Sequence, residues 1–275
     1  MFQVLTKAAG YSGMAGRLLY SIVSMKWNHS IWQPLSVMLL FSFACRKDNR
    51  GNEPQDKEYE VFSTTVPGFS GLCYSATKTS FYAASDNGTI YEIATDGSTI
   101  RQLPVTGNYD FEAIAIDAVQ DRLYIADESL MNLYWLTPNQ NSLNLVTHIS
   151  IPGGVSNKGI EGLAFGPDTL YIVNQESPTL LIKYALGSQA ETHRIPVDFA
   201  SYLSDIFFDP SDNSLWICDS QQQLLFHCTL NGTLIATQDI DFVPKAEALV
   251  IDRAGNTAWI GCDQSSKLFK VKLKI

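Results

Sequence analysis

Serine or glutamate recurs along this chain at a nearly constant spacing, each time before an apolar run. The recurring residues are Ser70, Glu112, Glu161, Ser204 and Glu247, which stand 42, 49, 43 and 43 positions apart. Three glutamates brought into a narrow space would raise one another's pKa unless a cation lay among them. Carboxylate oxygens suit Ca²⁺. We therefore expect Glu112, Glu161 and Glu247 to line a calcium site.

A second set of polar residues follows the second apolar run of each unit. The set comprises Asp86, Asp127, Glu128, Asn174, Glu176, Asp219 and Asp263. Together with Ser70, Ser204 and Asp205, these residues are the expected polar lining of a ligand-binding surface. The competing interpretation is that solvent screens the acids and that they bind nothing.

The polar residues belong to a repeated unit of three strand-like runs. In the second unit the runs are 112–117, 123–128 and 133–136, which are rich in β-branched and aromatic residues. A fourth run, such as 100–105, connects successive units, and turns rich in Asp, Asn and Gly separate the runs. Four strands in roughly 40–50 residues is the spacing of a propeller blade. The pattern predicts an all-β, five-bladed β-propeller over residues 58–275.

Strand direction brings the two polar sets together. Consecutive strands of a blade are antiparallel, so the start of the innermost strand lies beside the end of the second. Both sets are therefore expected at one mouth of the central channel. The last unit ends one strand short, and residues 57–64 form a spare strand before the first unit. We expect this strand to complete the fifth blade and close the ring, which removes an exposed sheet edge.

The first 57 residues are typical of an exported lipoprotein. Residues 1–44 are expected to be a signal peptide or leader, with Met25 as an alternative start, because the apolar run 35–44 is too short to span a bilayer. Ala44 before Cys45 resembles a lipobox, although Ser42 stands where leucine is usual. Cys45 would then carry the lipid, and residues 45–57 would form a flexible tether. An unlipidated signal peptide or a signal anchor is the alternative.

The charge of the chain limits the classes of partner that it can bind, and its cysteines allow a prediction of their state. After residue 44 the chain has 16 basic and 28 acidic residues, a net charge of −12. Nucleic acid is excluded because its phosphates require clustered Lys and Arg. We expect a monomer held at the membrane by its lipid, in the cell envelope and as an outer-membrane lipoprotein. The remaining cysteines are expected to be buried free thiols; they are Cys73, Cys218, Cys228 and Cys262.

Several segments carry a resemblance to a known family. The segments 111–115, 157–164, 203–206 and 245–249 look like the SdiA-regulated domain family, and the resemblance covers about residues 58–275. It implies a five-bladed propeller, distantly similar to NHL-repeat proteins, with a calcium site and no established enzymatic activity. The chain departs from the family pattern where glycines are replaced, at Ala113, Asp205 and Ala248. It also departs at Gly68 and Tyr202, where an Asp commonly precedes the Ser.

Two functions compete. The first is a non-catalytic, calcium-binding scaffold domain for a small-molecule or protein ligand. The alternative is a calcium-dependent hydrolase of the lactonase or esterase type, in which Asp127 or Asp219 would act as the base. Such lactonases resemble six-bladed rings, which weighs against the alternative. The histidines lie outside the acidic positions, and Trp216 and Trp259 recur at one repeat position, as expected for packing between blades.

Overall fold

The computed structural model describes residues 58–154 and 158–274, and these form five four-stranded antiparallel sheets. The predicted leader, Cys45 and the tether up to residue 57 lie outside the described residues. Blade 1 contains β2 (Phe69–Ser75), β3 (Ser80–Ser85), β4 (Thr89–Ala94) and β5 (Thr99–Gln102). Blade 2 contains β6 (Phe111–Asp117), β7 (Arg122–Asp127), β8 (Asn132–Leu136) and β9 (Asn144–His148).

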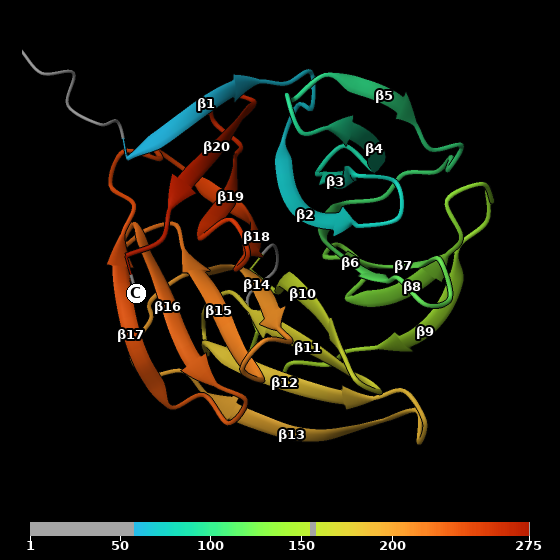
Figure 1. The fold of residues 1–275 in the computed structure, drawn as a ribbon. Helices are drawn as coiled ribbons and strands as arrows, with labels where there is room; N and C mark the ends of the chain where they lie inside the picture. The colour runs from blue at the N-terminus through green and yellow to red at the C-terminus, as the bar shows by residue number, and fades with distance from the viewer. Residues whose placement is uncertain (1–57, 155–157, 275) are drawn as a thin grey trace, which may run out of the picture. The chain divides into compact units, whose positions relative to one another are not determined.

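The other three blades repeat this arrangement. Blade 3 contains β10 (Ile160–Gly166), β11 (Thr169–Asn174), β12 (Leu180–Ala185) and β13 (Ala190–Pro196). Blade 4 contains β14 (Leu203–Asp209), β15 (Ser214–Asp219), β16 (Leu224–Thr229) and β17 (Leu234–Asp239). Blade 5 contains β18 (Ala246–Asp252), β19 (Thr257–Cys262), β20 (Lys267–Lys272) and β1 (Tyr59–Ser63). The first strand of each of these five runs lies nearest the centre of the ring (Figure 1). The prediction of a five-bladed β-propeller is confirmed.

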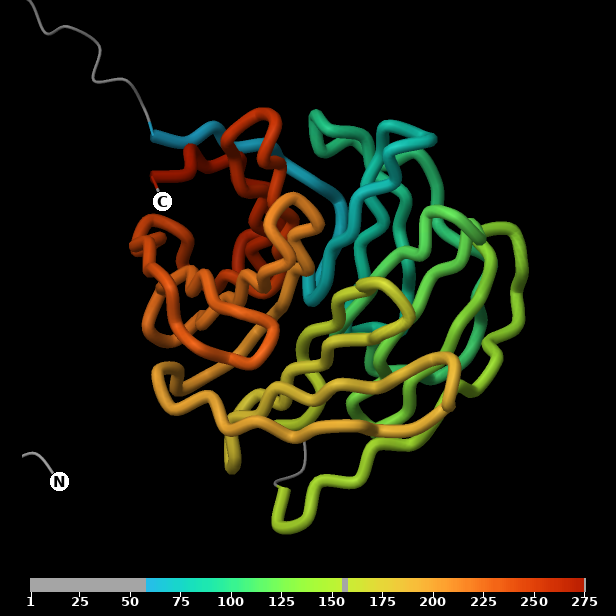
Figure 2. The backbone as a smooth tube through the Cα atoms, turned by 60° about the horizontal axis from the view of Figure 1, so that its bottom comes forward, coloured from blue at the N-terminus to red at the C-terminus, as the bar shows by residue number. Residues whose placement is uncertain are grey.

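The ring is closed by the N-terminal strand, as the sequence predicts. β1 pairs antiparallel with β20, from Tyr59 opposite Val271 to Ser63 opposite Lys267. The blue N-terminal strand and the red C-terminal strand lie side by side (Figure 2). β1 therefore covers an edge of β20 that would otherwise be open to another chain.

Apolar side chains pack between neighbouring blades. Trp216 of blade 4 packs with Leu249 and Ile260 of blade 5, and Trp259 of blade 5 packs with Phe81 of blade 1. The tryptophans therefore serve blade packing, as expected. Four cysteines in the described residues are buried and free, which confirms the prediction for Cys73, Cys218, Cys228 and Cys262. Within residues 58–154 and 158–274, no helix has the length and hydropathy needed to cross a membrane.

Replacing Tyr59 by alanine is expected to weaken the closure. The Tyr59 ring stacks on Phe242 at 4.3 Å and lies 6.0 Å from Phe269. Removing a partly buried ring of this kind costs about 2 kcal/mol. Val61→Ala is the matched control, because Val61 is on the same strand but 43% exposed. Urea denaturation should show a clear loss for Tyr59→Ala and a small one for Val61→Ala; equal losses would contradict this role for the ring.

Candidate functional site

Each innermost strand begins with an irregularity at its recurring Ser or Glu. The strand register shifts between Phe69 and Gly71, which leaves Ser70 unpaired with β3. The same shift occurs around Glu112, Glu161, Ser204 and Glu247. A bulge inserts one unpaired residue and re-aims its side chain. The five-fold repeat of the sequence thus becomes a ring of five bulges, which we call the mouth.

The two serines of the mouth are engaged with the backbone. Ser204 Oγ donates to the carbonyl of Ala246 in the next blade at 2.7 Å, and Ser70 Oγ donates to the carbonyl of Gly68 at 3.0 Å. Both serines are buried. A hydroxyl that satisfies a buried carbonyl stabilises the bulge, so the serines support the mouth and the glutamates supply its charge.

Three carboxylates of blade 2 come together at the mouth. One oxygen each from Asp110, Glu112 and Glu128 lies within 4.8 Å of the others. We call this group the acidic triad. Glu112 and Glu128 were expected here, but Asp110 was missed. Its signal is its place two residues before Glu112, the position at which Gly68 and Tyr202 replace an Asp in the Ser units.

Burial and mutual repulsion raise the pKa values of the mouth acids. Burial is the main cause at Glu112, and Asp110, Glu128 and Glu247 add to it, so its pKa rises to about 8. Burial likewise raises the pKa of Glu247 to about 7. The pKa of Glu161 lies well above its ordinary value because of burial and the charges of Glu112, Glu128 and Glu247. The charges of Glu112 and Glu247 thus act on Glu161, but of these three expected calcium ligands only Glu112 belongs to the acidic triad.

Two lysines at the mouth form ion pairs with acids outside the acidic triad. Lys245 Nζ lies 2.5 Å from Asp263 Oδ2 and 3.2 Å from Glu247 Oε1. Lys158 forms an ion pair with Glu176. In the part of the chain that the structure describes, no Lys or Arg forms an ion pair with a member of the acidic triad. The charges of the triad are therefore not neutralised by direct ion pairs, although Glu128 accepts from the backbone N–H of Gly159.

The polar residues that end the second strands mostly organise turns. Asp219 Oδ1 accepts from the backbone N–H groups of Gln221 and Gln222, and its Oδ2 accepts from those of Ser201 and Tyr202. Asn174 donates to the carbonyls of Glu176 and Pro178. Asp127 Oδ1 accepts from Ser129 Oγ at 2.7 Å, whereas its Oδ2 is buried without a partner. Of these residues, Asp219 is the most fully engaged.

Glu128 connects two blades at the mouth. Its Oε1 accepts from the backbone N–H of Gly159 at 2.6 Å, and its backbone N–H donates to the carbonyl of Asp110.

Backbone conformation and space explain why residue 68 is a glycine. Its φ is +51°, and a Cβ there would lie 1.9 Å from Asp86 Oδ1. The carboxylate of Asp86 thus occupies the space that a side chain at residue 68 would need.

The model of one family, described as phytase-like with the esterase-like activity of phytase, matches residues 64–274. The chain belongs to the phytase-like family. The match covers nearly all of the propeller and every residue of the acidic triad. The resemblance to the SdiA-regulated domain family stays a prediction from the sequence.

Solved structures of low sequence identity share the fold of this phytase-like propeller. A glutaminyl cyclase from Myxococcus xanthus is 14% identical with a TM-score of 0.61, and the match covers 78% of this chain and 94% of that one. A luciferin-regenerating enzyme is 11% identical with a TM-score of 0.51, and the match covers 78% of this chain and 95% of that one. A chain of a nidogen–laminin complex is 13% identical with a TM-score of 0.51, and the match covers 74% of this chain and 76% of that one. At these identities the likeness concerns the fold alone.

The phytase-like propeller also holds a carboxylate inside its ring. Asp205 is 1% exposed and accepts from the backbone N–H of Ile206 at 2.8 Å and from that of Leu249, in blade 5, at 2.6 Å. Burial raises its pKa well above the ordinary value. The Asp205 side chain therefore connects blades 4 and 5. Asp205 was expected at the polar surface, and its contacts instead join backbone groups between blades.

Replacing Asp205 by alanine is expected to destabilise the propeller by roughly 2–4 kcal/mol, because it leaves two buried N–H donors without acceptors. Asp205→Asn is the matched control: its amide oxygen keeps one acceptor in the same volume, so its loss should be clearly smaller. Guanidinium denaturation of both variants measures the difference. An alanine variant as stable as the wild-type protein would show that Asp205 does not hold the blades together.

Proposed function

We propose that the mouth binds a calcium ion and that the protein acts as a calcium-dependent binding domain for an anionic small-molecule or protein ligand. The observation that carries the proposal is the acidic triad, with an oxygen of Asp110, Glu112 and Glu128 within 4.8 Å of one another. Ca²⁺ takes carboxylate oxygens at about 2.3–2.6 Å, so ligands around one ion can lie this far apart.

The donor set fits a hard cation. All three donors are carboxylates, and none forms an ion pair within the described residues. The burial that raises the pKa of Glu112 and Glu128 is a cost that a bound cation would offset. Glu161 and Glu247 belong to blades 3 and 5 and would complete the negative field. Lys158 and Lys245 are the cations of the mouth that an anionic ligand would contact, in competition with their partners Glu176 and Asp263.

Ester hydrolysis is the second candidate, because the family is described by an esterase-like activity. A bound divalent cation would polarise an ester carbonyl. Glu247 is our candidate for the general base: it lies at the mouth with Oε1 3.2 Å from Lys245 Nζ, and burial raises its pKa to about 7. Both oxygens of Asp219 accept backbone hydrogen bonds, which makes Asp219 the weaker choice of base.

Two measurements test these proposals in turn. Calorimetric titration of the chelator-treated protein with CaCl₂ should show one saturable site, and a protein that retains and binds no metal would contradict the calcium proposal. An assay with aryl esters and lactones, with and without EDTA, then separates the two functions. Metal-dependent turnover that disappears in Glu247→Gln, with calcium binding intact, would support the hydrolase; no turnover with intact calcium binding would favour the binding domain.

We also propose that the protein is an envelope lipoprotein anchored through Cys45. The apolar run 35–44 that ends at Ala44 and Cys45 supports this. Residues 45–57 would then separate the lipid from the propeller. Mass spectrometry of the mature N-terminus tests cleavage and lipidation together, because a chain that begins at a diacylated Cys45 has a defined mass. A mature chain that retains residues 1–44 would overturn this proposal.

A further inference from the structure

One arginine of the propeller differs from the others. The described residues contain four arginines, and three of them bind carboxylates: Arg101 binds Glu92, Arg194 binds Glu191, and Arg253 binds Asp209 and Asp212. The Arg122 side chain makes no ion pair or hydrogen bond with any described residue, and its Nε is buried without a partner. A guanidinium carries five donors and stays charged. Arg122 is partly buried, so a ligand that accepts from its unbonded Nε would recover the free energy lost there.

Arg122 lies on the face opposite the mouth. It begins β7, whereas the mouth lies at the end of that strand. The guanidinium carbon is 4.0 Å from the centroid of the Trp135 ring. Stacking on an aromatic face holds the guanidinium plane and leaves its edges free for a planar anion. Arg122 also lines a cavity of about 420 Å³ between blades 2 and 3.

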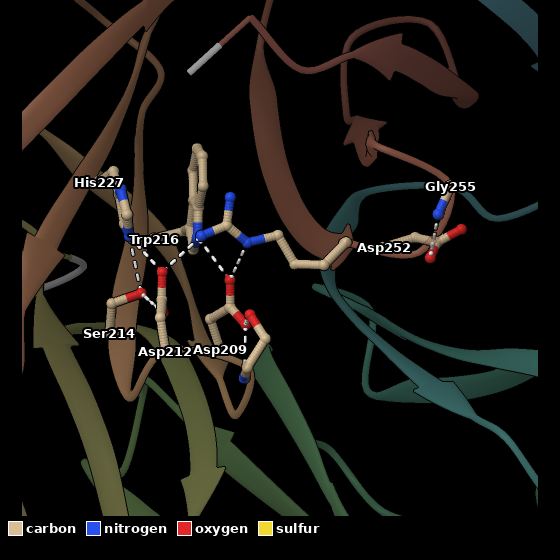
Figure 3. Close-up of polar contacts among 9 residues, drawn as sticks. Asp209, Asp212, Ser214, Trp216, His227, Asp252 and Gly255 are labelled. Atoms are coloured by element: carbon tan, nitrogen blue, oxygen red, sulfur yellow. Dashed lines mark hydrogen bonds and ion pairs between the residues drawn. The ribbon is translucent and has the colours of Figure 1, made fainter.

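On the same face, Arg253 is an arginine that is paired with carboxylates. Between blades 4 and 5, Arg253 Nε lies 2.6 Å from Asp209 Oδ2, which also accepts from Trp216 Nε1 at 3.1 Å. Asp209, Asp212 and Trp216 converge in Figure 3, with His227 beside them. This junction satisfies its charges internally. The junction between blades 2 and 3 leaves Arg122 open to its cavity.

The cavity wall supplies three kinds of contact. Arg122 provides the positive charge, and Trp135, Phe165 and Leu145 provide apolar surface. Leu145 is 60% exposed, so its side chain is accessible to a ligand in the cavity. Asp168 adds an exposed acceptor for an N–H group. Asp117 also lines the cavity, but its Oδ1 already accepts from the backbone of its own turn.

We propose that this cavity, the Arg122 groove, binds the carboxylate of a hydrophobic N-acylated amino acid. The carboxylate would receive the guanidinium donors, the apolar side chain would cover Leu145 and Phe165, and the amide N–H would face Asp168. The same chemistry is offered by a free N-acyl amino acid and by the C-terminal residue of a peptide. The groove lies apart from the mouth, so it does not depend on calcium or on hydrolysis.

Ligand-detected NMR titration of the full chain tests the groove with three probes. N-acetyl-L-phenylalanine should bind, and its C-terminal amide should bind about tenfold more weakly or worse, because a charge-assisted hydrogen bond is lost. N-acetyl-Ala-Ala-Phe distinguishes the sources: tighter binding than the single amino acid indicates a peptide C-terminus, and much weaker binding indicates a free metabolite.

Arginine variants show whether Arg122 is responsible. Arg122→Gln should lose about tenfold or more in affinity for N-acetyl-L-phenylalanine, and Arg122→Lys should fall in between because it keeps the charge but not the fork. Arg194→Gln is the matched control, since that arginine is paired at the surface of blade 3. Equal affinity for acid and amide, unchanged binding by Arg122→Gln, or no binding of the acid at about 10 mM would each overturn the proposal.

Discussion

Replacing Asp110 by asparagine and Glu112 by glutamine together is expected to weaken calcium binding by roughly 100-fold or more, because calcium affinity follows the number of charged ligands. These substitutions remove two of the three carboxylates of the acidic triad and keep the side-chain volumes. Calorimetric titration with CaCl₂ measures the loss. Far-ultraviolet circular dichroism should show an unchanged β-sheet spectrum, because neither residue forms an ion pair among the described residues.

Glu60→Gln is the matched control for this experiment. Glu60 is an acid of β1 whose side chain is 67% exposed, so its replacement changes the net charge without touching the mouth. Its calcium affinity should equal that of the wild-type protein. A double variant that still binds calcium with wild-type affinity would place the ion elsewhere. Equal weakening by Glu60→Gln would mean that overall charge, and not the triad, attracts the ion.

The metal-free protein is expected to lose stability as the pH rises from about 5.5 to about 8.5. Glu112 and Glu247 have pKa values of about 8 and about 7 in the folded protein, above the ordinary 4.5. Between these values the folded state binds more protons than the unfolded state. The stabilisation is therefore complete below pH 4.5 and is lost as the pH passes through the folded pKa values. We expect a fall of roughly 3 kcal/mol, since each unit is worth about 1.4 kcal/mol and water near the mouth weakens the effect.

Calcium should oppose this fall, because it replaces the protons that the acids release. At about 100 times its dissociation constant, calcium would add about 2.7 kcal/mol. Urea denaturation at both pH values, with CaCl₂ or EDTA, measures both effects. Glu112→Gln in EDTA should have a shallower pH dependence, and this comparison cancels the opposite contribution of His227, whose pKa is lowered by burial. Rising stability of the metal-free wild-type protein over this range would contradict the buried-acid interpretation.

The fold could be predicted because its signals are local. Runs of β-branched and aromatic residues separated by Asp, Asn and Gly turns specify strands and hairpins over a few residues. Repetition then sets the number of blades, since one blade cannot bury its faces alone. The closure by β1 followed from a missing strand in the last unit, a deficit that counting reveals.

The candidate site was only partly predictable. Glu112 and Glu128 belong to the repeat, and they do meet at the mouth. Asp110 lies outside the strand run and joins them because the chain bends into the bulge of β6. Asp219 carries the same residue type, yet its oxygens cap a turn. Residue type alone does not distinguish a carboxylate that is free to bind a cation from one that already accepts hydrogen bonds from backbone N–H groups.

The recurring Ser and Glu that begin each unit show what the sequence by itself determined, which is a five-fold ring with an acidic mouth. Periodicity and residue type can be read from the sequence without knowledge of any contact. The tertiary structure decided which acids meet, that Asp205 joins blades 4 and 5, and that Arg122 alone among the four described arginines lacks a carboxylate. These outcomes depend on which blades become neighbours. Electrostatic pairing acts over a few ångströms in space and has no fixed separation along the chain.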